Sequence, residues 1–336
     1  MSKSELLKKI KKNSTNSMIS ELMETELLNE KEIISTNIPA LNIALSGTLE
    51  GGFTAGITTF AGKSKSFKTL FALELAKGFL EKHEDAVLVF FDSEFGSPLS
   101  YFESFGENRD RILHVPITTV EELRTEIANQ LDGIERGDHV IFIVDSIGNL
   151  ASIKETEDAL DGKQVVDMTR AKALKSFFRI VTPKLVIKNI PMITINHTYD
   201  TLEMFSKQVM TGGTGNVFAA DTIIFVGKQQ EKEGTELKGW NFILNIEKSR
   251  YVREKSKLPI LVTYDSGISK YSGIFDLAVE VGFIESPTKG FYIVDGGDKK
   301  VRRKEIEGNM ELMEEIVNDE KFSQLVESKF RLTYHE

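Results

Sequence analysis

The chain has 336 residues, of which 40% are apolar and 28% charged, as in an ordinary globular protein. Its net charge of −9, from 42 basic and 51 acidic residues, argues against a protein that coats nucleic acid by bulk electrostatic attraction alone. The sequence has no cysteine, which excludes disulfides, thiolate metal sites and cysteine nucleophiles. It shows no apolar run as long as a membrane span and no signal peptide, so we expect a cytoplasmic protein without a membrane partner.

The first twelve residues combine lysines with leucines and predict a short basic amphipathic helix. Further along, short runs rich in β-branched and aromatic residues predict strands. Several of these runs are nearly continuous hydrophobics, which is typical of strands buried on both faces of a parallel sheet. The runs are Ile57–Ala61, Val87–Phe91, Ile112–Val115, Val140–Val144, Met192–Ile195 and Thr222–Val226.

Helical patterns lie between these runs, at Leu70–Lys82, after Thr119 and at Val165–Val181. Thr119 is a suitable N-cap, and Glu122 three residues later predicts a capping box. Apolar residues then follow at spacings of three and four, which places them on one face of a helix. The alternation of strands and helices predicts an α/β fold with a mostly parallel sheet and right-handed crossovers.

The pattern changes after about residue 228. Phe242–Ile246 and Ile260–Thr263 predict strands, joined by a loop with five basic and two acidic side chains. Gly273–Val281 predicts a short helix, Phe291–Val294 a strand and Lys304–Ser328 one long helix. These elements predict a small α+β domain at the C-terminal end.

The segment Gly62-Lys63-Ser64-Lys65-Ser66-Phe67-Lys68-Thr69 follows a predicted strand and opens the helix at Leu70. This is the context of a phosphate-binding P-loop, in which N–H groups at a helix start surround a phosphate. Lys68 would neutralise the terminal phosphates, and the Thr69 hydroxyl would ligate Mg²⁺. Phe67 departs from the usual pattern, which has glycine directly before the lysine. Taken alone, the segment leaves nucleotide binding and an ordinary turn equally open.

Two further strands are predicted to end in carboxylates, at Glu94 and at Asp145. Ligands of doubly wound sheets bind at the carboxyl edge of the strands. There Asp145 could complete a magnesium shell, and Glu94 could polarise an attacking water. A strand-end acid can also cap a helix, but three strand ends that converge on one edge weigh against that reading.

Over about 240 residues the chain resembles the RecA class of DNA recombinases, and within it the phage UvsX-type proteins. The resemblance begins at Ser35–Leu45, runs through the P-loop and both acidic strand ends, and includes Gly273–Ala278. A phenylalanine before the P-loop lysine is also found in UvsX-type proteins, so Phe67 supports the resemblance.

The resemblance implies a RecA-like P-loop ATPase core over residues 35–270. A helical N-terminal assembly segment, 1–34, would precede the core, and a small C-terminal domain, 271–336, would follow it. ATP and Mg²⁺ are the implied cofactors. The implied function is a homo-oligomeric helical filament on single-stranded DNA that pairs with homologous double-stranded DNA, exchanges strands and serves recombination and repair. Single-strand-binding and mediator proteins would be further partners, and the host bacterial cytoplasm the location if a phage encodes the chain.

By the same resemblance, the nucleotide contacts are Gly62 to Leu70 together with Tyr101, which would stack on adenine. Lys68 and Thr69 bind phosphate and Mg²⁺, Asp145 belongs to the metal shell, and Glu94 is the water-activating base. A core tyrosine is an equal reading of Tyr101 from sequence.

Three more catalytic residues are implied. His197 would sense the γ-phosphate, although a lone histidine is often structural. Lys248 and Arg250 would reach into the ATP site of the neighbouring protomer, where cations stabilise the transferring phosphoryl group. A solvated basic loop is the alternative for both.

Two loops are expected to face DNA, Ala151–Gly162 and Thr198–Gly215. The second is glycine-rich and nearly neutral, which suits close backbone approach and intercalation of an apolar side chain. A surface loop without such a role is the alternative. The expected DNA contacts are Phe205, Met210, Gly212 and Gly213.

Two other functions remain open. A ring helicase motor would use the same core, but it would lack the Ser35–Leu45 segment and the C-terminal domain. A non-catalytic DNA-coating or mediator protein with a vestigial nucleotide site is favoured by Phe67 alone.

Overall fold

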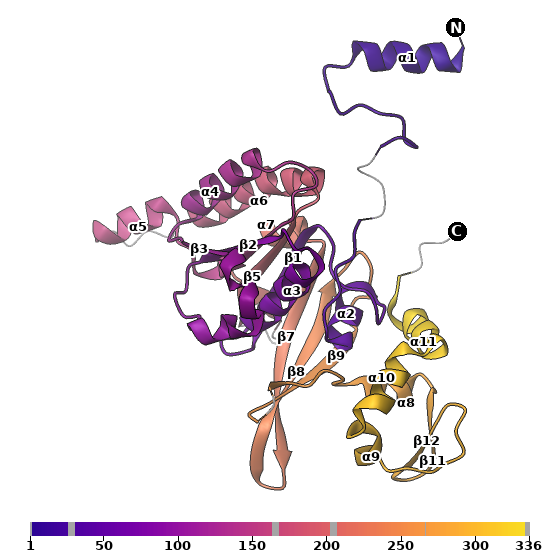
Figure 1. Cartoon of the computed structure of the whole chain (residues 1–336). Helices are drawn as coiled ribbons and strands as arrows, with labels where there is room; N and C mark the ends of the chain where they lie inside the picture. Colours follow the sequence, from indigo (N-terminus) through magenta and orange to yellow (C-terminus); the bar gives the residue numbers. More distant parts are fainter. Residues whose placement is uncertain (1, 26–30, 163–167, 202–206, 266, 333–336) are drawn as a thin grey trace. The chain divides into compact units, whose positions relative to one another are not determined.

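The computed structural model describes residues 2–25, 31–162, 168–201, 207–265 and 267–332 (Figure 1). Its internal contacts divide the chain into two units, Met1–Glu32 and Ile33–Glu336.

In the first unit, helix α1 (Lys3–Asn13) forms where the basic amphipathic pattern predicts it. Ser2 and Glu5 close a capping box at its start, so each satisfies a backbone N–H of the other. Leucine and isoleucine side chains of α1 are exposed.

The second unit contains a large sheet and a short hairpin. The strands of the large sheet are β1 (Gly56–Gly62), β2 (Val87–Asp92), β3 (Ile112–Pro116), β4 (Val140–Asp145), β5 (Pro191–Asp200), β6 (Gln208–Met210), β7 (Thr222–Glu233), β8 (Glu236–Lys248), β9 (Lys257–Thr263) and β10 (Gly267–Ile268). Their order is β10-β9-β8-β7-β1-β5-β4-β2-β3, and β6 pairs with β5.

All six strands predicted from the hydrophobic runs before residue 228 form. They pair in parallel in the order β3-β2-β4-β5-β1-β7, and β7 to β10 continue the sheet as antiparallel strands. The predicted α/β fold with a mostly parallel sheet is therefore confirmed.

Helices cover both faces of the parallel strands (Figure 1). On one face lie α2 (Pro39–Ser46) and α3 (Lys68–Lys82), and on the other α4 (Val120–Gly133) and α6 (Thr169–Lys188). Strand β4 alternates between the two cores, because successive side chains of a strand point to opposite faces. This three-layer packing leaves the carboxyl edge of the strands as the place for a site.

Shorter helical segments connect these elements. The helix predicted at Val165–Val181 is found as α6 from Thr169, and residues 163–167 lie outside the described ranges. None of the described helices combines the length and the apolar character that a bilayer span needs. The connecting segments are η2 (Leu99–Arg111), η3 (Ile147–Asn149), α5 (Ile153–Leu160) and α7 (Gly215–Ala219).

The C-terminal part of this unit carries a hairpin and four short helices within the described residues. Its buried residues, including Ile306, Met313 and Phe322, belong to the same apolar cluster as α2 and α3. The elements are α8 (Ile274–Glu280), β11 (Ile284–Thr288), β12 (Phe291–Val294), α9 (Arg303–Glu307), α10 (Met310–Asn318) and α11 (Glu320–Phe330).

The single helix predicted over Lys304–Ser328 is wrong. The chain breaks it twice, after Gly308 and at Asp319. The Asn309 side chain accepts a hydrogen bond from the N–H of Leu312, and the Asp319 side chain accepts one from Phe322. Each cap satisfies a donor at the start of a new helix, which favours separate helices over a continuous one.

Two smaller predictions are corrected. Thr119 caps α4, but the Glu122 carboxylate accepts from Thr118 and so does not close the expected capping box. The segment Ala151–Gly162, expected as a loop, contains α5, which begins with a capping box at Ser152.

Candidate functional site

The P-loop lies between the end of β1 and the start of α3. At Gly62 a side chain would bring its Cβ within 2.8 Å of the Val226 carbonyl oxygen, so only glycine fits. The loop turns over residues 63–67, and α3 begins at Lys68. The first N–H groups of a helix lack helical partners and carry the positive end of the dipole, so this start favours an anion.

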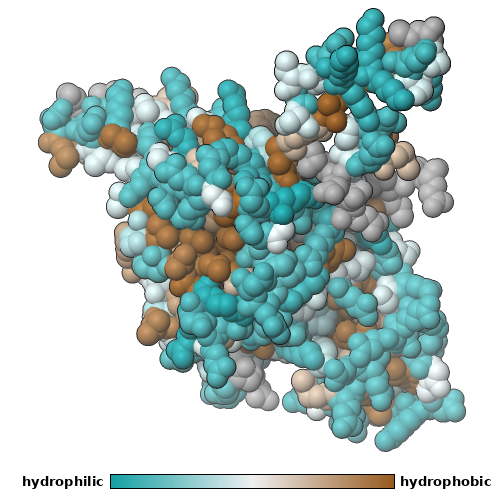
Figure 2. Space-filling model, turned by 45° about the horizontal axis from the view of Figure 1, so that its top comes forward, coloured by the Kyte–Doolittle hydropathy of each residue, from teal (hydrophilic) through white to brown (hydrophobic). Residues whose placement is uncertain are grey.

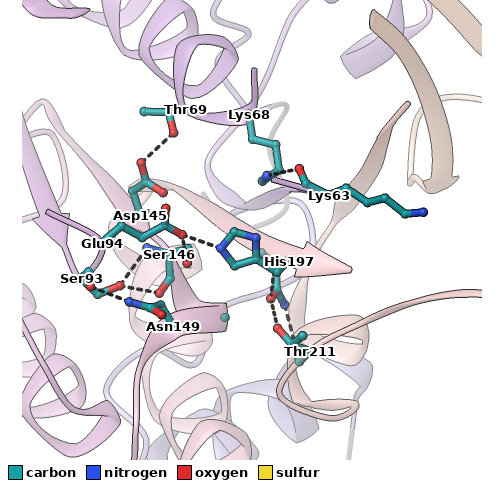
Figure 3. A network of polar contacts seen from close by, with 12 residues as sticks. Lys63, Lys68, Thr69, Ser93, Glu94, Asp145, Ser146, Asn149, His197 and Thr211 are labelled. Atoms are coloured by element: carbon teal, nitrogen blue, oxygen red, sulfur yellow. Dashed lines mark hydrogen bonds and ion pairs between the residues drawn. The ribbon is translucent and has the colours of Figure 1, made fainter. Parts of the chain in front are cut away.

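The ammonium of Lys68 is folded into this loop (Figure 3). Lys68 is 6% exposed, and its Nζ donates to the Lys63 carbonyl at 2.9 Å and to Ser66 Oγ at 3.4 Å. Burial lowers the pKa of Lys68, and the nearby carboxylates of Glu94 and Asp145 oppose that shift. A buried ammonium bonded to neutral oxygens is a favourable place for an incoming phosphate.

Thr69 and Asp145 form the second part of the site. Thr69 Oγ1 donates to Asp145 Oδ2 at 2.7 Å, while Asp145 Oδ1 is buried without a hydrogen-bond partner among the described residues. Burial raises the pKa of Asp145 to about 6. A hydroxyl beside a carboxylate oxygen that lacks a partner supplies the hard oxygen ligands that Mg²⁺ prefers.

Glu94 is held between two partners at the end of β2. Its Oε1 accepts from His197 Nε2 at 2.5 Å and from Ser146 Oγ at 2.6 Å. The bond to His197, more than any other contact, lowers the pKa of Glu94 to about 2. Glu94 is therefore ionised and only weakly basic in this arrangement.

A buried amide connects His197 to the segment after β5. Asn196 Oδ1 accepts from the His197 N–H at 2.8 Å and from Thr211 Oγ1 at 2.7 Å. Its Nδ2 donates to the Thr211 carbonyl at 3.1 Å, and Thr211 N–H donates to the His197 carbonyl at 3.0 Å. Figure 3 shows this chain of contacts running from Glu94 to Thr211. The ring of His197 thus contacts Glu94, while its backbone is bonded to Asn196 and Thr211 of the segment expected to face DNA.

A cavity of about 590 Å³ opens over these groups. Its lining includes Ser64–Leu70 of the P-loop, the carboxylates of Glu94 and Asp145, His197, and Tyr101 of η2. The structure therefore brings together most of the residues that the sequence assigned to nucleotide, metal and catalysis.

The cavity wall also has an aromatic part that was not predicted from the sequence. It is formed by Trp240 and Phe242 of β8 and by Tyr264 after β9. Trp240 Nε1 donates to Tyr264 Oη at 3.0 Å, and Lys228 Nζ lies 3.7 Å from the indole centroid. Trp240 and Phe242 stand two residues apart, which places them on one face of a strand and was the available signal. Such a wall suits a planar base.

Some predicted residues are not brought to the cavity. Gly62 packs closely against Ser66 and the Val226 carbonyl but is not among the described lining residues of the cavity. Lys63 pairs with Asp200 at 2.7 Å through its ammonium and contributes only its carbonyl to Lys68.

Lys248 and Arg250 are also not among the described residues that line the cavity of their own chain. Lys248 Nζ donates to carbonyls at the end of α7, including that of Ala220 at 2.6 Å. Burial lowers the pKa of Lys248. Arg250 Nε pairs with Asp221 Oδ1 at 2.5 Å, and 65% of the Arg250 side chain is exposed.

The residues predicted to contact DNA divide into three cases. Phe205 lies outside the described residues. Met210 is 5% exposed and belongs to the core under α6, so its side chain is not presented to solvent as expected. Gly212 and Gly213 adopt positive φ angles of 85° and 78°, a turn that L side chains rarely adopt.

No family profile matches the chain. The recombination and repair protein of Enterobacteria phage T4 is 51% identical over 289 residues, which cover 86% of this chain and 74% of that protein. Protein RecA of Paenarthrobacter aurescens is 27% identical over 299 residues, 85% of this chain and 81% of that protein. Protein RecA of Corynebacterium efficiens is 28% identical over 320 residues, 91% of this chain and 78% of that protein.

The chain belongs to the RecA class of DNA recombinases. The resemblance to phage recombinases and the RecA-like core are thereby confirmed. Members of this class are DNA-dependent ATPases of recombination and repair, and the recombinase described here binds nucleotide as they do.

The recombinase variant Asp145→Asn should remove a pH-dependent loss of stability. Because the pKa of Asp145 rises from 3.8 to about 6 on folding, the folded protein binds more protons than the unfolded chain between these values. The free energy of unfolding of the wild type therefore falls by about 3 kcal/mol as pH rises through this window. The variant lacks this slope, so its stability relative to wild type should rise by about 2–3 kcal/mol from about pH 4 to about pH 7.

Urea denaturation across that pH range measures the difference. Glu103→Gln, at an exposed position, is the control and should follow the wild type. Parallel pH profiles for Asp145→Asn and wild type would contradict the buried, proton-binding state of Asp145.

Proposed function

We propose that this recombinase binds ATP with Mg²⁺, assembles as a helical filament on single-stranded DNA and exchanges strands with a homologous duplex. One observation carries the proposal. A single cavity gathers the P-loop with the buried Lys68, the carboxylates of Glu94 and Asp145, and His197. Phosphoryl transfer requires this combination of positioning, charge neutralisation and an oriented water.

The donor set fits Mg²⁺–nucleotide. Thr69 Oγ1 and Asp145 would hold the metal shell, and Lys68 with the loop N–H groups would hold the phosphates. In the described ranges, no cluster of three or more carboxylate, histidine or cysteine side chains could hold a metal by itself. Mg²⁺ typically takes only one or two protein ligands and completes its shell with phosphate oxygens and water. The bound ion would neutralise charge on the phosphates, and Tyr101 would stack on adenine.

Glu94 would orient the attacking water and accept its proton. A carboxylate with a pKa near 2 is a poor proton acceptor at neutral pH, so the contact with His197 holds Glu94 in a resting state. When His197 turns to the terminal phosphate, Glu94 loses the bond that lowers its pKa most. DNA bound beyond Thr211 would shift the backbone of His197 through Asn196 and so favour this movement, which would account for DNA-stimulated turnover.

Lys248 and Arg250 would act on the ATP of the neighbouring protomer. Lys248 is the last residue of β8, and Arg250 follows two residues later. Neither is among the described lining residues of their own cavity, which supports a role across an interface. Cations supplied in this way stabilise the transferring phosphoryl group and are worth about 10³ to 10⁵ in rate.

The surface supports assembly of copies of this chain. Polar residues cover most of the face shown in Figure 2, and apolar residues gather in a patch on it. A groove of about 570 Å³ between α6 and α7 is lined mainly by apolar side chains, and one of them, Phe218, is 75% exposed. Exposed apolar patches of this kind mark protein–protein contacts.

DNA would bind at the segment that contains Phe205, Gly212 and Gly213, and at α5. Binding by stacking and close backbone approach suits both the net negative charge of the chain and a sequence-independent filament. Single-strand-binding and mediator proteins would be further partners, and the location would be the cytoplasm, that of the host bacterium if a phage encodes the chain.

Electron microscopy with single-stranded DNA and a non-hydrolysable ATP analogue tests the assembly. We expect helical filaments together with strand exchange on homologous duplex DNA. Closed rings with unwinding activity would support a helicase motor. DNA coating without ATP turnover would support a non-catalytic protein.

Lys68→Ala should abolish ATP turnover, because phosphate loses its buried cationic partner.

Glu94→Gln should retain ATP binding and slow hydrolysis at least about a hundredfold, because an amide cannot accept the proton. Single-turnover hydrolysis and equilibrium nucleotide binding separate the two effects. Hydrolysis at the wild-type rate by Glu94→Gln would remove that residue from catalysis.

Mixing Lys248→Ala with Lys68→Ala tests the role across the interface. Each variant alone should lack DNA-stimulated turnover. In the mixture, interfaces that join an intact P-loop to an intact Lys248 form, so part of the activity should return. If the mixture stays inactive while both variants co-assemble on DNA, the cations do not act between protomers.

Phe205→Ala should weaken single-stranded DNA binding with nucleotide affinity unchanged, because stacking contributes about 1–3 kcal/mol per base. Fluorescence anisotropy across a salt titration measures this. A stacking loss shifts the affinity at every salt concentration and leaves the slope unchanged. Superimposable curves for variant and wild type would rule out a DNA contact by Phe205.

A further inference from the structure

Three phenylalanine rings meet where the P-loop contacts the sheet. The ring of Phe67 stacks on that of Phe242 from β8, with centroids 4.8 Å apart and planes at 26°. Phe71 of α3 completes the cluster, at 5.9 Å from Phe67 and 6.1 Å from Phe242. Phe71 and Phe242 are buried, while Phe67 is half-buried and lines the cavity.

The backbone of Phe67 explains why this contact matters. Phe67 has φ 66° and ψ 13°, the left-handed conformation, and it is the N-cap of α3. Glycine adopts this conformation without cost, whereas a bulky side chain disfavours it. Phe67 also makes no side-chain hydrogen bond to the start of the helix. Its conformation must therefore be maintained by packing.

This turn determines where the phosphate-binding groups lie. Lys68 follows Phe67 directly, and Thr69 comes next, so the φ and ψ of Phe67 orient both residues relative to β1. If Phe67 relaxed to a right-handed or extended conformation, the N–H groups of the first turn of α3 would point elsewhere.

We propose that Phe67 is a positioning residue, whose ring, stacked on Phe242, holds the P-loop in the turn that presents Lys68. The proposal rests on the proposed phosphate site at Lys68. It makes β8 part of the nucleotide site, because the ring contact replaces the conformational freedom that glycine would supply. Phe242 is well placed for this role, since it is flanked by Lys228 of β7 and Ile260 of β9 within the sheet.

The experiment compares side chains at position 67 in the full-length protein. Isothermal titration calorimetry with Mg²⁺–ADP and with a non-hydrolysable ATP analogue measures affinity, and thermal unfolding measures folding. Phe67→Ala keeps the backbone penalty and loses the ring, so it should bind about tenfold more weakly than Phe67→Gly. Phe67→Leu keeps most of the apolar volume but cannot stack, and it should bind more weakly than wild type, as the alanine variant does.

The same comparison made in a Phe242→Ala variant gives a result that lost side-chain volume alone cannot produce. In wild type, Phe67→Gly should weaken binding, because the loop loses its packing. In Phe242→Ala, where the stacked ring is already absent, Phe67→Gly should strengthen binding several-fold, because it removes a penalty that the edge contact with Phe71 alone does not offset. Phe242→Leu provides the same comparison if the alanine variant does not fold.

A merely structural Phe67 would rank glycine below alanine, in proportion to the lost volume, in both backgrounds. That ranking, or equal affinity of the glycine and alanine variants, would overturn the proposal. Lys68→Ala in the same titrations separates the two levels. If Lys68→Ala weakens nucleotide binding while the variants at position 67 all have the same affinity, only the role of Phe67 is wrong. If it binds like wild type, the phosphate site is wrong and the role of Phe67 falls with it.

Discussion

The parallel register of the central strands is the constraint on which the site depends. β1 and β5 pair so that Gly62 lies opposite His197, and β2 and β4 pair so that Asp92 lies opposite Asp145. A shift of one residue would displace a strand end by about 3.3 Å and turn its side chains to the other face. Because both faces of these strands are apolar, hydrophobicity alone specifies the register weakly. A buried hydrogen bond of 2.7 Å between the side chains of Thr59 and Thr194 favours the observed register of β1 and β5, because a shifted register would leave both hydroxyls without this partner.

The alignment of the strand ends brings charged side chains close together at this edge. The ammonium of Lys68 lies near the carboxylates of Asp145 and Glu94, whose pKa values are shifted in opposite directions. Burial raises the pKa of Asp145, while His197 and Ser146 lower that of Glu94. Two carboxylates of the same site thus differ because one is buried with a single hydroxyl donor and the other is partly exposed with two donors. Asp145 is thus suited to a cation, and in the proposed mechanism Glu94 would accept a proton only after losing its bond to His197.

The sequence predicted the strands of the parallel sheet because strands buried on both faces read as hydrophobic runs. It also predicted which strand ends carry polar groups, since an acid or a P-loop is adjacent in sequence to the strand that positions it. The C-terminal helices were mispredicted because apolar spacing continues across Gly308 and Asp319, and local caps decided the outcome.

Contacts between distant segments could not be predicted in this way. Glu94 and His197 are 103 residues apart, and Phe67 and Phe242 are further apart still, so their pairing depends on strand order. The burial of Met210 has the same origin, because the short strand β6 pairs back onto β5 and turns that side chain into the core. Phe67 looked like a defect in the P-loop motif because the ring on which it stacks, Phe242, lies on β8, far away in the sequence.

The resting contacts of the site also constrain how its ligands can influence each other. Lys68 is bonded to the Lys63 carbonyl and Glu94 to His197, so under the proposed function nucleotide would exchange both contacts for new ones. The backbone of His197, not its ring, is bonded to Asn196 and Thr211, so an exchange that moved this backbone would also move Thr211. If DNA favours the state in which His197 has left Glu94, nucleotide that stabilises this state must strengthen DNA binding by the same factor. The coupling would therefore be reciprocal, and it would pass through the backbone contacts of His197 with Asn196 and Thr211.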